Sequence, residues 1–299
     1  MPKIAVIINA GSGTESDNDA LIKTLRDEFA AHDIEADIKL AESGEQLVAF
    51  AVEAAASECE IIVAGGGDGT ISAVAEEVIK TGKILGVLPL GTLNHFSRDL
   101  KIPPVPAEAI NVIANGRGVE IDVGEVNGRI FLNNSSIGLY PHIVRKREQQ
   151  QHRLRRGKWP AAFWAAVAVL RRYPFLHIKI DIGGKALERK TPFVFVGNNR
   201  YEMEGFRIGA RDDLDKGKLS LYVVQRTGRL GLVILALRSL FKMLKQAKDF
   251  EEYLVEEIEI KTKRRKHLLV ALDGEVSAMS APLRYKIRPK ALKVMVSNE

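Results

Sequence analysis

The first 125 residues alternate between short apolar runs and longer segments with helical periodicity, and this alternation restricts the fold more than any other feature. The apolar runs lie at 3–9, 34–40, 60–65 and 83–91, and the helical patterns lie at 16–31, 44–57 and about 70–81, with a further helix expected after residue 91. Strands that alternate with crossover helices predict a parallel sheet covered by helices on both faces. The sequence therefore predicts a doubly wound α/β domain in the N-terminal part.

After about residue 120 the pattern changes to short alternating segments, which are typical of antiparallel strands. The segments lie at 119–126, 129–136, 176–188, 192–199, 218–224, 256–262, 267–275, 282–289 and 291–297. Gly183 and Gly184 predict a hairpin turn inside the third of them. Helical patterns interrupt the series at 159–172 and 229–248. The second half is therefore predicted to be an antiparallel β-rich domain, either a sandwich or a barrel.

The stretch GGGDGT at residues 65–70 follows the third apolar run and opens the third helical pattern. So many glycines cost backbone entropy, so the chain must need an unusual backbone or the absence of side chains here. A glycine-rich turn before a helix exposes backbone N–H groups that can bind phosphate oxygens. The stretch is not a Walker A loop, because the Gly-Lys-Ser/Thr ending is missing, and Thr70 stands where the dinucleotide fingerprint has its last glycine.

Two further turns of small residues follow predicted strands, NAGSG at 9–13 and PLGTLNHFSRDL at 89–100. Because the carboxyl ends of parallel strands meet at one edge of a sheet, we expect the three turns to converge on a single crevice, where open α/β sheets bind ligands. A carboxylate at Asp68 would repel a phosphate that it touched directly. Its position therefore predicts a Mg²⁺ ion between Asp68 and the phosphates.

The combination of GGGDGT with PLGTLNHFSRDL resembles the diacylglycerol kinase catalytic-domain family, specifically its bacterial soluble lipid kinases. The resemblance continues at 133–144, 196–224 and 272–276, and so covers nearly the whole chain. It implies ATP and Mg²⁺ as cofactors and a lipid as substrate. It also implies a nucleotide-binding α/β domain at 1–122, to which residues 287–299 return, and a lipid-binding antiparallel β-sandwich at 123–286.

The resemblance carries over to individual positions. The nucleotide-binding residues that it implies are Asn9, Ser12, Gly13, Gly65, Gly66, Gly67, Asp68, Gly69, Thr70, Gly91, Thr92 and Asn94. Asp68 and Glu275 are expected to be catalytic, with Glu275 as the general base that accepts the proton of the acceptor hydroxyl. Asp68, Asp99 and Asp273 are expected to be metal ligands. Without the resemblance, the Asp-Gly-Glu sequence at 273–275 is typical of an ordinary hairpin turn.

Three positions depart from the family pattern. One is the nucleotide-contacting threonine that the family usually has before Gly44, where this chain has KLAESG. The family usually has an aspartate where this chain has His95, and Asp99 lies four residues further on, on the same face of a helix that starts near Asn94. The family also usually has an aspartate that binds a structural metal where this chain has Lys216. A lysine ammonium at that position can donate to carbonyl groups directly, so we expect it to replace the metal.

Positive charge is concentrated between residues 145 and 172. Nine basic residues stand there against the single acid Glu148, whereas the whole chain has a net charge of +6. The basic residues are Arg145, Lys146, Arg147, Arg153, Arg155, Arg156, Lys158, Arg171 and Arg172. A solvated surface is one interpretation, and peripheral docking on an anionic membrane is the functional one. We expect no nucleic-acid partner, and the sequence gives no indication of oligomeric state.

The apolar run at 159–170 is shorter than the roughly 20 residues that span a bilayer. The N-terminus lacks the pattern of a secretory signal, and a single cysteine excludes an internal disulfide. We therefore expect a cytoplasmic, peripherally membrane-associated protein. The sequence favours an ATP- and Mg²⁺-dependent lipid kinase acting on a hydroxyl of diacylglycerol or a sphingoid base. The alternatives are an NAD kinase-like enzyme and a catalytically weakened regulator that binds nucleotide or lipid.

Overall fold

The computed structural model describes residues 3–10, 15–142, 144, 175–201, 203–204, 207–208, 211, 213–224, 250–263 and 265–298. The chain divides into two compact units, one formed by Met1–Val123 with Pro289–Glu299 and the other by Gly124–Arg288. The basic segment 145–172 and the helices predicted at 159–172 and 229–248 lie outside the described residues.

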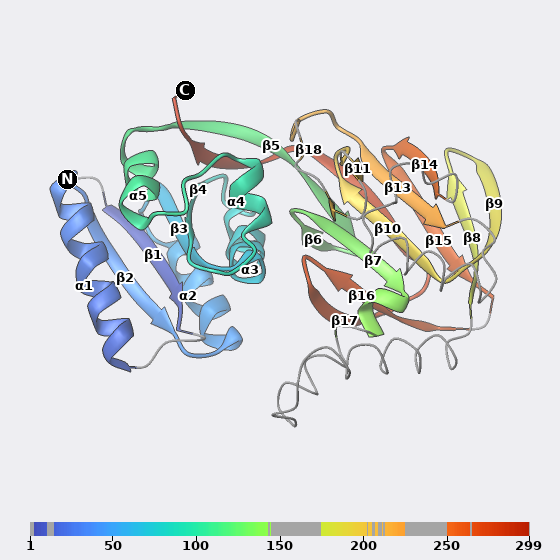
Figure 1. Ribbon diagram of the computed structural model, residues 1–299, viewed down its shortest axis with the longest axis horizontal. Coiled ribbons are helices and arrows are strands. Elements are labelled where there is room, and N and C mark those ends of the chain that lie inside the picture. Colours follow the sequence, from blue (N-terminus) through green and yellow to red (C-terminus); the bar gives the residue numbers. More distant parts are fainter. Residues whose placement is uncertain are drawn as a thin grey trace. The chain divides into compact units, whose positions relative to one another are not determined.

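The first unit contains a parallel sheet in the strand order β2-β1-β3-β4 (Figure 1). Its elements are β1 (Lys3–Asn9), α1 (Glu15–Ala31), β2 (Glu35–Ala41), α2 (Gly44–Ala56), β3 (Ile61–Gly66), α3 (Asp68–Val78), β4 (Ile84–Pro89), α4 (His95–Asp99) and α5 (Pro106–Asn115). The alternation of strands with helices that the sequence predicts is confirmed. Helix α5 was not predicted.

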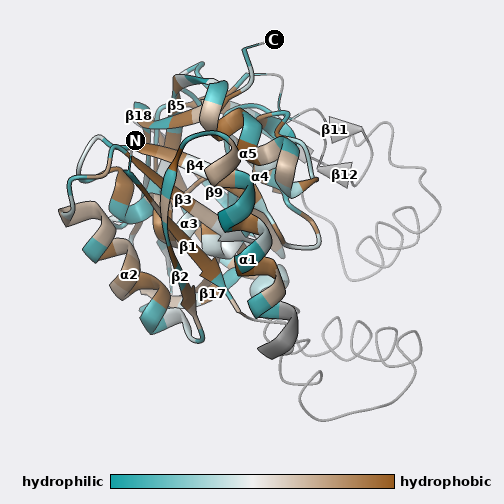
Figure 2. Ribbon diagram, turned by 90° about the vertical axis from the view of Figure 1, so that its left-hand side faces the viewer, coloured by the Kyte–Doolittle hydropathy of each residue, from teal (hydrophilic) through white to brown (hydrophobic). Residues whose placement is uncertain are grey.

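The helices of this unit pack in two pairs, α1 with α5 and α2 with α3. The chain crosses from β1 to β2 in one direction along the sheet and from β2 to β3 in the other, so right-handed crossovers place α1 and α2 on opposite faces. Figure 2 shows the strands between them as predominantly hydrophobic. Their apolar runs are continuous because both faces of the sheet are buried, as in Val6, Ile62 and Leu85.

Local sequence signals set several helix ends. The Ser43 hydroxyl accepts a hydrogen bond from the Gln46 N–H at the start of α2, and the Gln46 side chain accepts one from the Glu42 N–H. The first bond satisfies a donor that the first turn of a helix leaves free, and the second ties Glu42, which precedes the N-cap, to the same turn. Pro106 begins α5, a position at which its fixed φ suits a helix and its missing N–H costs nothing.

Strands β5 (Arg117–Val126) and β18 (Leu283–Val296) each have residues in both units. Near its end, β18 pairs in parallel with β4 through Lys293 and Val294, and the Lys290 N–H donates to Asp122 Oδ1 at 2.9 Å. The prediction of two strands at 282–289 and 291–297 is wrong, because β18 is a single strand. Pro289 and Lys290, which has a positive φ of 52°, lie within β18 without ending it.

The second unit contains two sets of antiparallel strands. One is a sheet in the order β14-β13-β10-β7-β16-β17, and in the other β15 pairs with β18 and β8, and β8 pairs with β9. The remaining strands are β6 (Arg129–Phe131), β7 (Asn134–Gly138), β8 (Leu176–Ile182), β9 (Lys185–Thr191), β10 (Phe193–Asn198), β11 (Met203–Glu204), β12 (Arg207–Ile208), β13 (Leu219–Val224), β14 (Phe250–Val255), β15 (Glu257–Thr262), β16 (His267–Leu272) and β17 (Glu275–Ser280).

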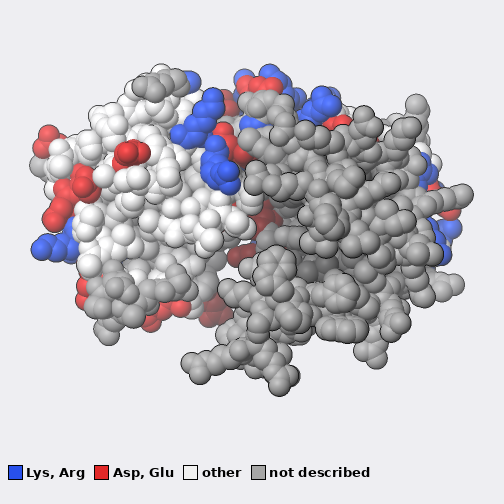
Figure 3. All heavy atoms as spheres, viewed as in Figure 1, with Lys and Arg blue, Asp and Glu red and all other residues white. Residues whose placement is uncertain are grey.

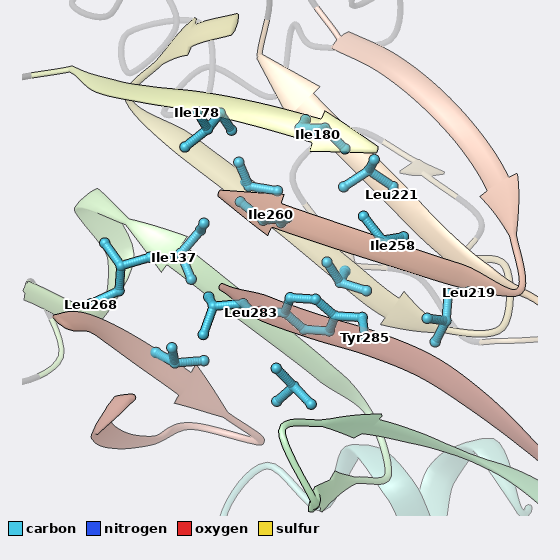
Figure 4. Packing of buried hydrophobic residues seen from close by; sticks show 14 of the residues in the cluster. Ile137, Ile178, Ile180, Leu219, Leu221, Ile258, Ile260, Leu268, Leu283 and Tyr285 are labelled. Atoms are coloured by element: carbon cyan, nitrogen blue, oxygen red, sulfur yellow. The ribbon is translucent and has the colours of Figure 1, made fainter. Parts of the chain in front are cut away.

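One hydrophobic cluster draws on both sets of strands. Figure 4 shows Ile178, Ile260 and Tyr285 from one set gathered with Ile137 and Leu221 from the other. The two sets therefore face each other across a common core, which is the arrangement of a β-sandwich. The predicted fold class, an α/β unit with a parallel sheet followed by an antiparallel sandwich, is confirmed. Strands β14 and β17 were not among the predicted strands.

Candidate functional site

The three small-residue turns follow β1, β3 and β4, which are neighbours in the parallel sheet. The Asn9 side-chain amide, at the end of β1, donates to Thr70 Oγ1 at 3.1 Å. The Leu90 N–H, after β4, donates to the Gly66 carbonyl at 3.1 Å. The predicted convergence of the turns at one edge of the sheet is therefore found. Ser12 and Gly13, from the first turn, lie outside the described residues.

The turns after β3 and β4 touch each other through their main chains. A Cβ atom added to Gly91 would lie 2.4 Å from Gly67 Cα and 2.7 Å from Asn94 Oδ1. A Cβ on Gly66 would lie 2.6 Å from Thr70 Oγ1. The backbone at Gly91 is not in the left-handed region, so close approach rather than conformation requires glycine here. The glycines thus bring two loops into direct backbone contact.

Helix α3 begins directly behind this contact. Gly67 is its N-cap, and no side chain of the described residues caps the helix through a hydrogen bond at this position. The first N–H groups of an α-helix have no intrahelical partner and carry a partial positive charge. The start of α3, with Asp68, Gly69 and Thr70 in its first turn, therefore offers main-chain donors that an anion such as phosphate would bind.

Asp68 connects the two glycine turns. Its carboxylate accepts hydrogen bonds from the His95 N–H (Oδ2, 3.1 Å) and the Phe96 N–H (Oδ1, 3.0 Å), and so caps the short helix α4. These two bonds join the turn after β3 to the start of α4. The role of Asp68 as a metal ligand remains a prediction. Asp99, the last residue of α4, is partly exposed.

Asn94 turns the chain into α4 with a left-handed backbone, φ 49°. Its side-chain N–H groups donate to the carbonyls of Pro89 (3.1 Å) and Gly91 (2.7 Å), which fixes the orientation of the amide. Its Oδ1 is buried and has no hydrogen-bond partner in the described part of the chain. A buried acceptor without a donor is costly, so this oxygen suits a cation or an ordered water. Thr92 is exposed in the same turn.

In the second unit, Asp273 and Gly274 form the turn between β16 and β17, with φ values of 47° and 93°. Two successive positive φ values are typical of the tight hairpin turns that favour Asp-Gly. Glu275 follows as the first residue of β17 and is exposed. The hairpin interpretation of the Asp-Gly-Glu element is therefore correct. The role of Glu275 as a general base remains a prediction.

The Asp273 carboxylate accepts three consecutive main-chain N–H groups. Oδ2 binds the Leu132 N–H at 2.7 Å, and Oδ1 binds the N–H groups of Asn133 and Asn134 at 2.8 and 2.9 Å. This contact spans about 140 residues of sequence, and sequence reasoning missed it. Because it holds a loop together, it gives Asp273 a structural role that is distinct from the predicted metal ligation.

The sequence also gives no indication of a role for Arg211, which is buried and lies outside the described helices and strands. Its guanidinium donates to the carbonyls of Leu132 and Asn198 and to Asn133 Oδ1, and it lies 5.4 Å from the Tyr201 ring centroid. A buried arginine among polar side chains has no periodic signature, so only its partners reveal it.

Lys216 lies at the surface, with its side chain 61% exposed. Its ammonium pairs with Asp213 at 3.3 Å and with Asp215 at 3.9 Å. Within the described residues, no hydrogen bond from Lys216 to a main-chain carbonyl is found, so the expected donation to carbonyls is not seen.

No group of three or more His, Cys, Asp or Glu side chains that could hold a metal ion occurs within the part of the chain that the structure describes. None of the described helices is long and apolar enough to cross a membrane. On the face shown in Figure 3, the described basic side chains occur among acidic ones. The basic segment predicted to bind membranes is not among the described residues, so that prediction stays open.

Two family models together account for most of the chain. The diacylglycerol kinase catalytic domain matches residues 3–126, and the YegS C-terminal NAD kinase beta sandwich-like domain matches residues 142–296. The parallel sheet with its glycine turns lies in the first match and the sandwich in the second. The fold and these turns are those of a diacylglycerol kinase-type protein. The chain belongs to the diacylglycerol kinase-like family.

Named relatives agree with this assignment. The chain is 28% identical over 171 residues to a diacylglycerol kinase of Staphylococcus carnosus (strain TM300), covering 56% of this chain and 55% of the relative. It is 27% identical over 205 residues to a diacylglycerol kinase of Staphylococcus aureus (strain JH9), covering 64% of each. The matches thus span between about half and two thirds of these relatives.

A solved structure of a diacylglycerol kinase from Bacillus anthracis str. Sterne has the same fold. It superposes with a TM-score of 0.68 over 99% of this chain and 97% of the other, at 19% sequence identity. At this identity, the likeness concerns the fold alone.

Proposed function

We propose that this protein is an ATP- and Mg²⁺-dependent lipid kinase that transfers the γ-phosphate of ATP to a hydroxyl group of a lipid. The acceptor would be a molecule such as diacylglycerol or a sphingoid base. The observation that carries the proposal is the backbone contact between Gly67 and Gly91 in front of the N-terminus of α3. That contact builds an anion-binding surface from main-chain groups within the part of the chain that matches the kinase catalytic domain.

The first unit would hold the nucleotide. The proposed contacts are Asn9 at the end of β1 with Ser12 and Gly13 beyond it, Gly65 to Thr70 from the end of β3 into the first turn of α3, and Gly91, Thr92 and Asn94 after β4. Main-chain N–H groups at the start of α3 would bind phosphate oxygens, because glycine leaves them accessible. Asp68 fixes the turn after β4 through α4, so both loops keep their places when a ligand enters.

Oxygen donors suited to Mg²⁺ are present in the same unit. They are the carboxylates of Asp68 and Asp99 and the unsatisfied carbonyl oxygen of Asn94. When bound, Mg²⁺ would neutralise charge on the transferring phosphoryl group. We do not include Asp273 in this set, since its carboxylate already accepts three main-chain N–H groups.

Glu275 would act as the general base. A hydroxyl group is a weak nucleophile, and its attack on phosphorus is assisted when a carboxylate accepts its proton. Glu275 is exposed at the end of a hairpin, where an acceptor molecule can reach it. The turn before it is anchored by Asp273, so its main chain starts from a fixed point.

The test is phosphate transfer from labelled ATP by the purified chain, with diacylglycerol, a sphingoid base and NAD as separate acceptors. We expect a lipid to be labelled and Glu275→Gln to lose about 10²- to 10⁴-fold in turnover while ATP binding is retained. Labelling of NAD alone would establish the NAD kinase-like alternative. NAD is included because residues 142–296 match an NAD kinase beta sandwich-like domain. ATP binding without transfer to any acceptor would indicate a regulator.

We also propose that segment 145–172 binds anionic membrane from the cytoplasmic side, because its nine basic residues stand beside Trp159, Phe163 and Trp164. Sedimentation with vesicles should increase with the fraction of anionic lipid and decrease with salt, and Arg155→Glu with Arg156→Glu should weaken it. Equal sedimentation with neutral and anionic vesicles at low salt would refute the idea. Tight, salt-sensitive binding to RNA would contradict the expectation of no nucleic-acid partner.

A further inference from the structure

The segment Leu132–Asn134, which runs from the end of β6 to the first residue of β7, is hydrogen-bonded through both sides of its main chain. On the N–H side, the Asp273 carboxylate receives the amides of all three residues at 2.7 to 2.9 Å. The Asp273 N–H in turn donates to the Asn134 carbonyl at 2.9 Å. The turn between β16 and β17 is thus attached to this segment by both its side chain and its main chain.

The carbonyl side of the same segment faces Arg211. Nη1 of Arg211 donates to the Leu132 carbonyl at 2.6 Å, and Nη2 donates to Asn133 Oδ1 at 2.9 Å. The Asn133 carbonyl accepts from the Asn198 N–H at 2.9 Å and from the Tyr201 hydroxyl at 2.8 Å. The Arg211 guanidinium lies over the Tyr201 ring, so the two donors support each other.

A single peptide group therefore lies between two opposite charges. The peptide that joins Leu132 to Asn133 directs its N–H to the Asp273 carboxylate and its carbonyl to the Arg211 guanidinium. Its dipole is aligned with the field of both ions, and hydrogen bonds to ionised groups are stronger than neutral ones. Arg211 is only 3% exposed, which limits screening by water. The charges act on each other through the peptide.

We infer that Arg211 and Asp273 are positioning residues for Glu275. Through the peptide groups of Leu132–Asn134 they fix the turn from which β17 starts, and Glu275 is the first residue of that strand. The inference rests on the proposed function, in which Glu275 is the general base. Neither residue needs to touch the reacting atoms. Removing Arg211 would leave the Asn133 side-chain oxygen and two main-chain carbonyls with fewer donors in a buried place.

The first variant is Arg211→Met, which keeps much of the apolar stem but removes the charge and the donors. A base displaced by a fraction of an ångström loses rate rather than substrate affinity, so kcat should fall about 10- to 100-fold. KM for ATP and for the lipid should change by less than about threefold. Arg211→Lys should recover part of kcat, because a lysine ammonium can reach one of the three acceptors.

The control for a general loss of stability is Tyr285→Phe. Tyr285 is buried in the same unit, and its hydroxyl bonds to Ser135, the residue of β7 that follows the segment Leu132–Asn134. This variant should lower the melting temperature and leave kcat of the folded protein unchanged. If Arg211→Met and Tyr285→Phe both lowered kcat, each in proportion to its loss of melting temperature, Arg211 would have only a structural role and the inference would be wrong.

The decisive measurement repeats Arg211→Met in the Glu275→Gln background. If Arg211 acts through Glu275, its loss should lower the residual turnover by less than about twofold there, because the group that it positions is already gone. The same 10- to 100-fold loss in both backgrounds would overturn the inference. Full turnover of Glu275→Gln alone would instead refute the base assignment of the proposed function.

Hydrogen exchange tests the clamp independently of the chemistry. Arg211→Met should speed exchange at the amides of Leu132–Asn134 and of the turn at Asp273, relative to Tyr285→Phe. Unchanged protection of these amides would overturn the inference, whatever the kinetics show.

Discussion

Gly91→Ala is the substitution whose effect follows most directly from the structure. The new methyl group would lie 2.4 Å from Gly67 Cα and 3.0 Å from Gly67 N, which are main-chain atoms at the start of α3. A flexible side chain could move away, but this main chain is continuous with β3 on one side and α3 on the other. Relief requires the two turns to separate, and forced overpacking of this kind costs about 1–3 kcal/mol.

The measurement is the free energy of unfolding from urea titration, with two glycine controls in the same unit. Gly67→Ala places its Cβ at an ordinary 3.7 Å from Gly91 Cα, and Gly44→Ala, at the start of α2, meets no atom within 4 Å. Gly44→Ala should be neutral or stabilising by up to about 1 kcal/mol, because alanine restricts the unfolded chain.

The two loop variants should also differ in function. Gly67→Ala should keep its stability but bind ATP more weakly, because its methyl group stands where phosphate oxygens would approach the N-terminus of α3. Gly91→Ala should lose both stability and binding. If Gly91→Ala proved as stable as Gly67→Ala, the backbone contact between the turns would not be as close as the structure shows.

Three further outcomes are expected. Burial, with a contribution from the Glu252 carboxylate, raises the pKa of Tyr222 to about 12. The stability that its bound proton contributes is therefore complete below about pH 10 and is lost as pH rises from there to about 12. In urea titrations Tyr222→Phe should flatten this decline of the unfolding free energy with pH, and an unchanged slope would contradict the reasoning. Lys216→Ala should change stability by less than about 1 kcal/mol, because its ion pairs are exposed, and EDTA should leave the melting temperature unchanged; a clear drop with EDTA would reveal a structural metal. Asp68→Asn should lower the free energy of unfolding by about 1–3 kcal/mol, because an amide N–H would face a main-chain donor of α4. Its residual turnover should need more Mg²⁺ for half-saturation than that of the parent protein. An unchanged Mg²⁺ requirement would mean that Asp68 only caps α4.

The parts of the fold that sequence predicts well are those with a local cause. Alternating strands and helices fix the parallel sheet, because the period of the apolar residues reports which face each segment buries. The convergence of the glycine turns follows from that sheet alone, since β1, β3 and β4 are parallel neighbours. The predicted start of the third helix at about residue 70 is two residues late, because glycine and aspartate at 68–69 look like loop residues. The N-terminal turn of α3 uses them anyway.

The parts that escape prediction depend on residues far apart in sequence. Nothing near Asp68 indicates that its carboxylate caps a helix 27 residues later, and nothing near Arg211 indicates that it reaches Asn133. Strand β17 was missed because the alternation in its sequence, EVSAMS, is short and breaks at Ala278-Met279, and Met279 is its one buried residue. Its place is set by the Asp-Gly turn and by pairing with β16, which is a tertiary rather than a local effect.

The sequence predicts metal binding for both Asp68 and Asp273, and in the structure both carboxylates accept hydrogen bonds from main-chain N–H groups. Each carboxylate receives consecutive main-chain N–H groups from another loop, two for Asp68 and three for Asp273. An aspartate that organises a loop and one that binds Mg²⁺ would both be inactivated by replacement with asparagine, because the variant loses an acceptor and gains a donor that faces other donors. Loss of activity at either position therefore does not identify a metal ligand. Only a change in the Mg²⁺ requirement, measured on variants whose folding has been checked, separates a ligand from an anchor, and by the bonds that it makes we expect Asp273 to be the anchor.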